Sequence, residues 1–166
     1  MYLDKEKIIS FLPHRDPFLF LDSIESIKKN DKELKAGDIT TNNDTLGVEI
    51  EANFHVRDDL QILRGHFPGN PILPGVVQVE MMAQASCFAI TVRAADPFNI
   101  NLDVAFMGIN NSKFRKPVVP GMNLKIKCIC TKCRGAFNNP IMSYDCKIFH
   151  EDILMSETTI LAMVKY

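Results

Sequence analysis

The stretch that decides the fold is Gly65–Ala95, which reads GHFPGNPILPGVVQVEMMAQASCFAITVRAA. From Pro74 onward it is the longest apolar run of the chain and is long enough for a helix. Apolar residues cover nearly every face of that helix, and the Pro-Gly pair at its start suits a helix N-terminus. We therefore predict a central helix that the rest of the fold encloses.

A membrane span is the competing interpretation of this run, because a bilayer requires about 20 apolar residues. Glu80 lies within the run, between Gln78 and Gln84. A carboxylate at that depth in lipid would be costly, and the sequence offers no second span. We therefore expect a buried helix and no association with a membrane.

The segments on both sides of this helix alternate apolar and polar residues, which is typical of half-buried strands. We predict strands at 18–27, 33–39 and 48–56 before the helix, and at 103–109, 113–114, 123–132, 141–150 and 153–164 after it. A short helix at 4–11 and an exposed hairpin tip at 40–45 complete the prediction. Several long strands around one buried helix make an antiparallel α+β domain.

The composition is that of an ordinary globular domain. The chain has 166 residues, 46% hydrophobic and 23% charged, and no repeat or linker divides it, so we treat residues 1–166 as one domain. A net charge of −1 gives no global field that would attract nucleic acid. The first residues are charged where a signal peptide is apolar, and five cysteines are an odd number, so we expect a cytoplasmic protein with free thiols.

Cys130 and Cys133 form a CxxC pattern close to Cys128, which raises the question of a zinc site. In a regular strand Cys128 and Cys130 face one side and Cys133 faces the other. The sequence has no second ligand pair with suitable spacing. We therefore expect no metal site.

The loop at 65–75 contains three glycines and three prolines, which fix its backbone path. Rigid loops hold functional groups in place, and His66 is the one residue of this loop that titrates near neutral pH. Beyond the loop, the carboxyl group of Glu80 lies in an apolar helix, where it is costly unless it is hydrogen-bonded or used. We interpret His66 as a catalytic base and Glu80 as a catalytic acid.

The start of the helix supplies a third feature. The backbone N–H groups near Gly75 and Val76, assisted by the helix dipole, could stabilise an oxyanion on a carbonyl group. A polarised thioester carbonyl acidifies its α-carbon, so a base and an acid there could eliminate water from a 3-hydroxyacyl thioester without a metal or organic cofactor. The alternative is structural, with His66 bonded to a loop carbonyl and Glu80 to a buried partner.

Three blocks of sequence resemble those of a known family. They are LPHRDPF at 12–18, the 65–75 loop followed by EMMAQ at 80–84, and FMGI at 106–109 through KFRKPVVPG at 113–121. In order and spacing they resemble the FabZ-type (3R)-3-hydroxyacyl-[acyl-carrier-protein] dehydratases of bacterial fatty acid synthesis. The resemblance implies a hotdog fold, in which an antiparallel sheet of about five to seven strands wraps a long central helix. It also implies a homodimer, with a trimer of dimers as a further possibility.

The resemblance implies roles for individual residues. His66 would act as base at the substrate α-carbon, Glu80 of the other subunit would protonate the departing hydroxyl group, and the N–H of Gly75 would bind the thioester oxygen. Glutamate rather than aspartate at position 80 favours a dehydratase without isomerase activity. The further substrate-binding candidates are Phe67, Pro74, Val76, Gln84 and Phe106.

The implied partner is acyl carrier protein, which presents the 3-hydroxyacyl chain on a 4′-phosphopantetheine arm. Because this carrier is acidic, Lys113, Arg115 and Lys116 are the candidate docking surface, with an ordinary solvated strand end as the alternative. His14 and Arg15 we interpret as residues that pin the N-terminal segment, with a place beside the active site as the alternative.

The chain also departs from the family pattern. Asp16 and Ala105 stand where tyrosine is usual, residues 59–64 lack a common Asn-Glu-Pro-Phe-Phe pattern, and residues 38–48 look like extra length. These departures affect the expected width of the acyl tunnel and leave open a specialised pathway, such as one that makes a polyene. Two rival functions for the same fold are a hotdog thioesterase and a non-catalytic subunit that binds acyl carrier protein.

Overall fold

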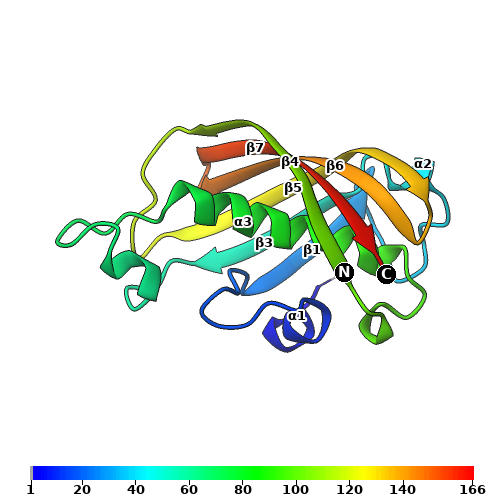
Figure 1. Cartoon of the computed structure of the whole chain (residues 1–166), viewed down its shortest axis with the longest axis horizontal. Helices are drawn as coiled ribbons and strands as arrows, with labels where there is room; N and C mark the ends of the chain where they lie inside the picture. The colour runs from blue at the N-terminus through cyan, green and yellow to red at the C-terminus, as the bar shows by residue number, and fades with distance from the viewer. Residues whose placement is uncertain (1) are drawn as a thin grey trace.

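The computed structural model describes residues 2–166. Its main feature is a seven-stranded sheet with the strand order β2-β1-β3-β5-β6-β7-β4, in which every pair of neighbours is antiparallel. Figure 1 shows helix α3 (Gly75–Ser86) lying across one face of this sheet. The helix continues as the 3-10 segment η2 (Cys87–Val92). The predicted arrangement of an antiparallel sheet around a central helix is thus what the chain adopts.

The remaining elements follow in chain order. The strands are β1 (Ser23–Lys29), β2 (Lys32–Glu33), β3 (Glu49–His55), β4 (Asp103–Phe114), β5 (Asn123–Ala136), β6 (Asn139–His150) and β7 (Ile153–Lys165). The other helical segments are α1 (Lys5–Phe11), α2 (Asn42–Thr45), η1 (Gln61–Arg64) and η3 (Pro97–Asn99).

The core lies between the inner face of the sheet and the central helix. Along β5 the residues alternate between buried and exposed, so Leu124, Ile126 and Cys128 point inward while the lysines between them point to solvent. Met81 and Phe88 on the helix are fully buried opposite them. Each such side chain contributes about 1.5–3 kcal/mol by leaving water. This packing fixes the position of the helix on which the candidate acid lies.

By length and composition alone, Gly75–Val92 could cross a membrane, and it is the one such helix among residues 2–166. Within the fold, however, 83% of this helix is buried. A helix that the fold encloses on nearly all sides needs apolar residues all round, for the same reason that a membrane helix does. The structure therefore accounts for the apolar run as the core helix that was predicted.

The strand predicted at 33–39 and the hairpin tip predicted at 40–45 are both wrong. Strand β2 has two residues, and Asn42–Thr45 forms the short helix α2 with Thr41 as its cap. Arg93, at the end of the central helix, donates to Asn42 Oδ1 at 2.9 Å and to Thr45 Oγ1. A contact from a distant part of the chain thus holds this segment in place. The local sequence pattern does not predict that contact.

Other boundaries shift by smaller amounts. Strand β1 begins at Ser23 instead of residue 18, because a loop occupies the preceding positions. The segments predicted at 103–109 and 113–114 form one strand, β4, with a register shift between Asn110 and Lys113. Such irregularities bend a strand without ending it.

The predicted alternation of the cysteines is also wrong. A register shift between Cys130 and Lys132 inserts one extra residue into β5, which turns Cys133 to the same side as Cys130. Arg93 accordingly reaches Cys133 Sγ, at 3.5 Å, from inside the fold. All five cysteines are free thiols, and residues 2–166 contain no group of three or more metal-ligating side chains.

Candidate active site

His66 lies in the loop between η1 and α3. Its Nδ1 is 2.8 Å from the carbonyl oxygen of Ile72, and its ring stacks on Phe67 with the centroids 4.1 Å apart. Because a carbonyl oxygen can only accept a hydrogen bond, Nδ1 carries the hydrogen and Nε2 is the basic nitrogen. The loop therefore orients the imidazole so that Nε2 can accept a proton.

A cavity of about 500 Å³ opens beside His66. One wall is the start of α3 and the other is the chain that follows β4. The lining residues relevant to chemistry are His66, Gly75, Val76, Phe114, Arg115 and Lys116. The cavity thus brings the candidate base together with a helix N-terminus and with two cationic side chains.

The helix start has little room for a larger residue. A Cβ atom on residue 75 would lie 2.8 Å from two ring atoms of Phe114, so glycine permits this close approach. The first N–H groups to bond within the helix are those of Val77 and Gln78, at 3.1 and 3.2 Å from the Pro74 carbonyl oxygen. The N–H groups of Gly75 and Val76 precede them and remain available to a ligand. Pro74 therefore acts as the cap of the helix.

Glu80 faces a different cavity, of about 360 Å³. Its side chain is 17% exposed. The surrounding walls are mostly apolar and include Pro13, Phe18, Leu102, Val104, Phe106, Tyr144, Ala162 and Val164. Burial, with a contribution from the charge of Glu80, raises the pKa of the neighbouring Cys87 thiol to about 12. Glu80 thus presents a carboxyl group to a space suited to an apolar chain.

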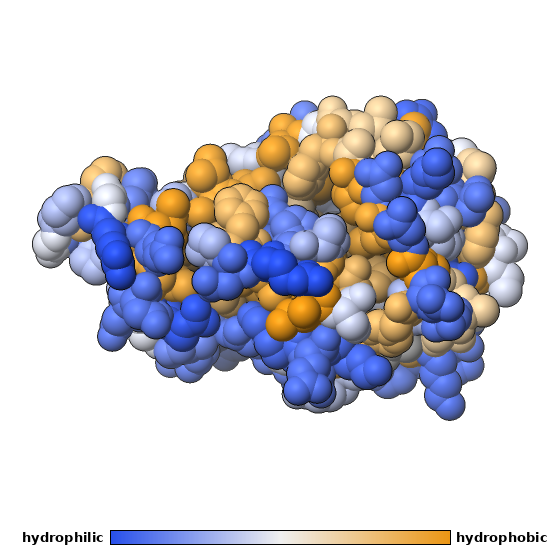
Figure 2. Space-filling model, turned by 60° about the horizontal axis from the view of Figure 1, so that its bottom comes forward, coloured by the Kyte–Doolittle hydropathy of each residue, from blue (hydrophilic) through white to orange (hydrophobic). Residues whose placement is uncertain are grey.

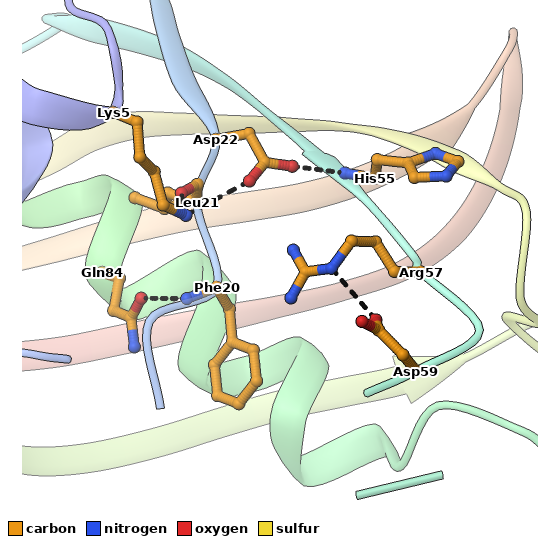
Figure 3. Close-up of polar contacts among 8 residues, drawn as sticks. All are labelled: Lys5, Phe20, Leu21, Asp22, His55, Arg57, Asp59 and Gln84. Atoms are coloured by element: carbon orange, nitrogen blue, oxygen red, sulfur yellow. Dashed lines mark hydrogen bonds and ion pairs between the residues drawn. The ribbon is translucent and has the colours of Figure 1, made fainter. Parts of the chain in front are cut away.

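Two side chains contact the carboxyl group of Glu80. Gln84 Nε2 donates to Oε1 at 2.9 Å, and His14 Nε2 lies 3.2 Å from the same oxygen. Gln84 lines the Glu80 cavity, so its predicted contact with substrate stays a prediction, and both ends of its amide form hydrogen bonds within the chain. Its oxygen accepts from the Phe20 N–H at 2.9 Å (Figure 3), and its nitrogen also donates to the Phe18 carbonyl at 2.9 Å.

His14 lies at the border of the Glu80 cavity, which is the second of the two places expected for it from the sequence. Arg15 has the structural role expected for it, since its Nη1 donates to the carbonyl oxygens of Leu12 and His14 at 2.8 and 2.7 Å. The LPHRDPF block stands out in the sequence because it resembles a motif of the family. No spacing in the sequence, however, predicts that His14 contacts Glu80.

Within one chain, His66 and Glu80 do not share a cavity. The described walls of the two cavities have no residue in common. Phe106, near the start of β4, belongs to the Glu80 cavity, whereas Phe114, at the end of β4, belongs to the His66 cavity. Phe67 and Phe106 are 52% and 46% exposed, so neither is a core residue in the isolated chain. A single copy therefore holds the candidate base and the candidate acid at different places along β4.

The basic candidates lie together near the His66 cavity. Arg115 and Lys113 both approach Glu157 Oε1, at 2.5 and 3.9 Å. The hydrogen bond from Arg115 is the main reason why the pKa of Glu157 lies below its usual value. Lys116 lines the cavity itself. Since two of these cations share one carboxylate, the cluster keeps an excess of positive charge.

The two positions at which the chain departs from the usual tyrosine, 16 and 105, lie away from the Glu80 cavity. In the described chain, neither Asp16 nor Ala105 is part of its wall. Asp16 lies beside Arg57 and Arg64 in a separate surface pocket, where Arg57 Nε donates to Asp59 Oδ1 at 3.2 Å (Figure 3). The expected effect of these two positions on tunnel width therefore stays a prediction for the assembled site.

Comparison with known proteins identifies relatives over nearly the whole chain. Residues 40–155 match the ApeI-like family, described as ApeI dehydratase. Over 164 residues the chain is 35% identical to 3-hydroxyacyl-[acyl-carrier-protein] dehydratase FabZ of Anaplasma phagocytophilum, covering 99% of each chain. It is 34% identical to the FabZ dehydratase of Ehrlichia canis, covering 99% of this chain and 97% of the relative.

A solved structure supports the fold. The dehydratase heterocomplex ApeI:P from Xenorhabdus doucetiae aligns with a TM-score of 0.60 at 15% identity, covering 96% of this chain and 91% of that one. At that identity the likeness concerns the fold alone. The predicted α+β hotdog fold is confirmed.

Proposed function

Because the chain belongs to the FabZ family of 3-hydroxyacyl-[acyl-carrier-protein] dehydratases, and is therefore a hydro-lyase, we propose that it converts (3R)-3-hydroxyacyl-[acyl-carrier-protein] to the trans-2-enoyl form in fatty acid biosynthesis. We propose His66 as the base and Glu80 as the acid. The observation that carries this assignment is the orientation of His66, whose Nδ1 is bonded to the Ile72 carbonyl oxygen and whose Nε2 has no partner among residues 2–166.

In the proposed reaction the thioester oxygen accepts hydrogen bonds from the N–H groups of Gly75 and Val76, which acidifies the α-carbon. His66 Nε2 removes the α-proton, and the electron pair of that C–H bond forms the new double bond. The bond between the β-carbon and the hydroxyl oxygen breaks as Glu80 gives its proton to that oxygen, and water leaves. His66 gains one proton and Glu80 loses one, and exchange with solvent returns both to their starting states.

We propose that two copies of the chain complete each site. Strand β4 is an edge of the sheet, and it exposes four large apolar side chains by 46–52%, namely Phe106, Met107, Ile109 and Phe114. In Figure 2, hydrophobic residues form patches on the face that is shown, and hydrophilic residues cover most of the lower edge of that face. An apolar edge strand without a neighbour is a surface for association.

The geometry of β4 explains how such a dimer would join the catalytic pair. Two antiparallel copies of β4, related by a two-fold axis, would bring the start of one strand beside the end of the other. Phe106 marks the Glu80 cavity and Phe114 marks the His66 cavity, so the Glu80 cavity of one copy would meet the His66 cavity of the next. Assembly into a trimer of dimers stays a prediction from the resemblance.

We also propose a cytoplasmic location. The five cysteines are all free, and three of them, Cys87, Cys130 and Cys146, have thiols whose pKa is raised by burial. Free thiols are the usual state in reducing compartments.

The direct test is interconversion of a trans-2-enoyl thioester and its (3R)-3-hydroxy counterpart, followed by ultraviolet absorbance and by mass. The proposal expects a change of about 18 mass units, which is one molecule of water, without release of free acid. Free acid would instead support a thioesterase. No reaction, with carrier-linked substrates of several lengths, would contradict the dehydratase proposal and support a binding subunit.

A second candidate is the same reaction in a specialised acyl pathway, which the departures from the family pattern at Asp16 and Ala105 leave open. The apolar walls around Glu80 are compatible with either kind of acyl chain. Higher kcat/KM for conjugated, polyunsaturated substrates than for saturated ones would support the specialised pathway, and the reverse order would support ordinary fatty acid synthesis.

We propose that acyl carrier protein docks on Lys113, Arg115 and Lys116. Because Lys116 lines the cavity of the candidate base, charge reversal by Lys116→Glu is expected to raise KM for a carrier-linked substrate about tenfold. It should change kcat/KM for a small pantetheine thioester by less than about twofold, because that substrate lacks the acidic carrier. Lys132→Glu on the exposed part of β5 is the matched control. Equal effects of both variants would contradict this docking surface.

A further inference from the structure

We infer that His14 is a positioning residue which, together with Gln84, fixes the proton of Glu80 on the carboxyl oxygen that faces away from both. The inference rests on the proposed role of Glu80 as the acid. It goes beyond that role because it states which oxygen delivers the proton, and it assigns a task to a residue of the N-terminal segment.

Two backbone groups set the orientation of the Gln84 amide. The Phe20 N–H can only donate, so the side-chain oxygen of Gln84 faces it at 2.9 Å. The Phe18 carbonyl can only accept, so Nε2 faces it at 2.9 Å. Figure 3 shows Gln84 reaching from α3 to Phe20, in the loop that precedes β1. Nε2 therefore donates its other hydrogen to Glu80 Oε1, at 2.9 Å, and Oε1 is the acceptor in that bond.

His14 approaches the same oxygen from the N-terminal segment. Its Nε2 lies 3.2 Å from Glu80 Oε1. Its other nitrogen, Nδ1, is buried and has no hydrogen-bond partner among residues 2–166. A hydrogen on Nδ1 would be a buried donor without an acceptor, which is costly. The hydrogen of His14 therefore belongs on Nε2. The partial positive charge of this N–H bond then points to the Glu80 carboxyl group.

The two N–H groups act together on Glu80. With both directed at Oε1, negative charge is best placed on that oxygen, and a proton is best placed on Oε2. Because Gln84 and His14 both contact Oε1, a proton on Oε2 stays out of this cluster of hydrogen bonds, and the side chain that carries it lines the cavity. After transfer, the same N–H groups stabilise the carboxylate that remains. Without His14, only Gln84 distinguishes the two oxygens.

The test compares two variants of His14. His14→Phe keeps a ring of similar size and removes the donor, and we expect kcat for a short enoyl thioester to fall about 10- to 100-fold while KM changes by less than about twofold. His14→Gln restores an N–H donor at a similar reach, and we expect kcat within about threefold of the unmodified enzyme. Equal loss in both variants would show that an N–H donor does not restore the function of His14, and full activity of His14→Phe would show that His14 only fills space. Either result would overturn the inference.

A second readout does not depend on activity. In the protein labelled with ¹⁵N-histidine, the His14 signals, identified by their absence in His14→Gln, should show a hydrogen on Nε2 and a bare Nδ1. The opposite tautomer would overturn the inference.

The control Glu80→Gln separates failure of this inference from failure of the proposed function. Activity retained in Glu80→Gln would refute the acid and His14's role with it. An inactive Glu80→Gln with a fully active His14→Phe would refute only the role of His14.

Discussion

Replacing His66 with alanine is expected to lower kcat/KM for hydration of a short trans-2-enoyl thioester by about 10²- to 10⁴-fold, the usual contribution of a general base. The reason is that Nε2 is the free basic nitrogen of a ring whose Nδ1 is held by the Ile72 carbonyl oxygen. Steady-state kinetics by ultraviolet absorbance measures the effect. Glu80→Gln should cause a loss of similar size, because an amide cannot give a proton to the leaving hydroxyl group.

The matched control is His66→Asn. The amide nitrogen of asparagine can take the place of Nδ1 and keep the bond to Ile72, but the residue has no basic nitrogen. Equal losses in His66→Asn and His66→Ala, with unchanged thermal unfolding, would attribute the effect to the missing base. If His66→Asn kept more than about a tenth of the activity, the assignment of His66 as the base would be wrong.

Replacing Arg93 with methionine is expected to lower the free energy of unfolding by about 3–5 kcal/mol. Arg93 is 3% exposed and forms no ion pair with a carboxylate among residues 2–166. Its charge is instead held by neutral acceptors, which include Asn42 Oδ1 at 2.9 Å, the Phe137 carbonyl oxygen at 2.6 Å and the Tyr166 hydroxyl oxygen at 3.0 Å. Methionine fills much of the same space but donates no hydrogen bond. The Asn42 and Phe137 oxygens then keep only Cys133 Sγ and the Tyr166 hydroxyl group as donors, at 3.4 and 2.8 Å.

Urea denaturation measures this loss. Arg134→Met, at an exposed position on β5, is the control and should change the free energy of unfolding by less than about 0.5 kcal/mol. A loss below about 1 kcal/mol for Arg93→Met would mean that water or rearranged side chains satisfy the acceptors, and the buried arginine would not be what holds α2 and the end of β7 in place.

The parts of the fold that could be predicted from sequence are those whose local pattern agrees with their environment. Helix α1 has an aspartate cap and an apolar stripe, and β3 and β5–β7 alternate between core and solvent. Helix α2 could not be predicted, because Arg93 contacts it from far along the chain. The side of the sheet to which Cys133 points depends on a single extra residue in β5. The alternation of apolar and polar residues does not reveal that extra residue.

For the candidate site, too, the sequence identifies some residues, whereas some contacts appear only in the folded chain. His66 and Gly75 stand out because a loop rich in glycine and proline precedes a helix, and Glu80 stands out as a carboxyl group in an apolar run. The contact between His14 and Glu80 exists only in the folded chain. The separation of His66 and Glu80 into two cavities is likewise a property of the packing of β4 against the helix start, which sequence spacing does not reveal.

The central proposal is that His66 of one copy works with Glu80 of another, and a purified mixed dimer tests it most directly. His66→Ala and Glu80→Gln chains with different tags are co-expressed, and two successive affinity steps isolate the dimer that contains one of each. The proposal predicts about half the activity of the unmodified dimer, because one of its two sites combines an intact His66 with an intact Glu80. A mixed dimer as inactive as either parent would contradict it and would place both residues of each site on one chain.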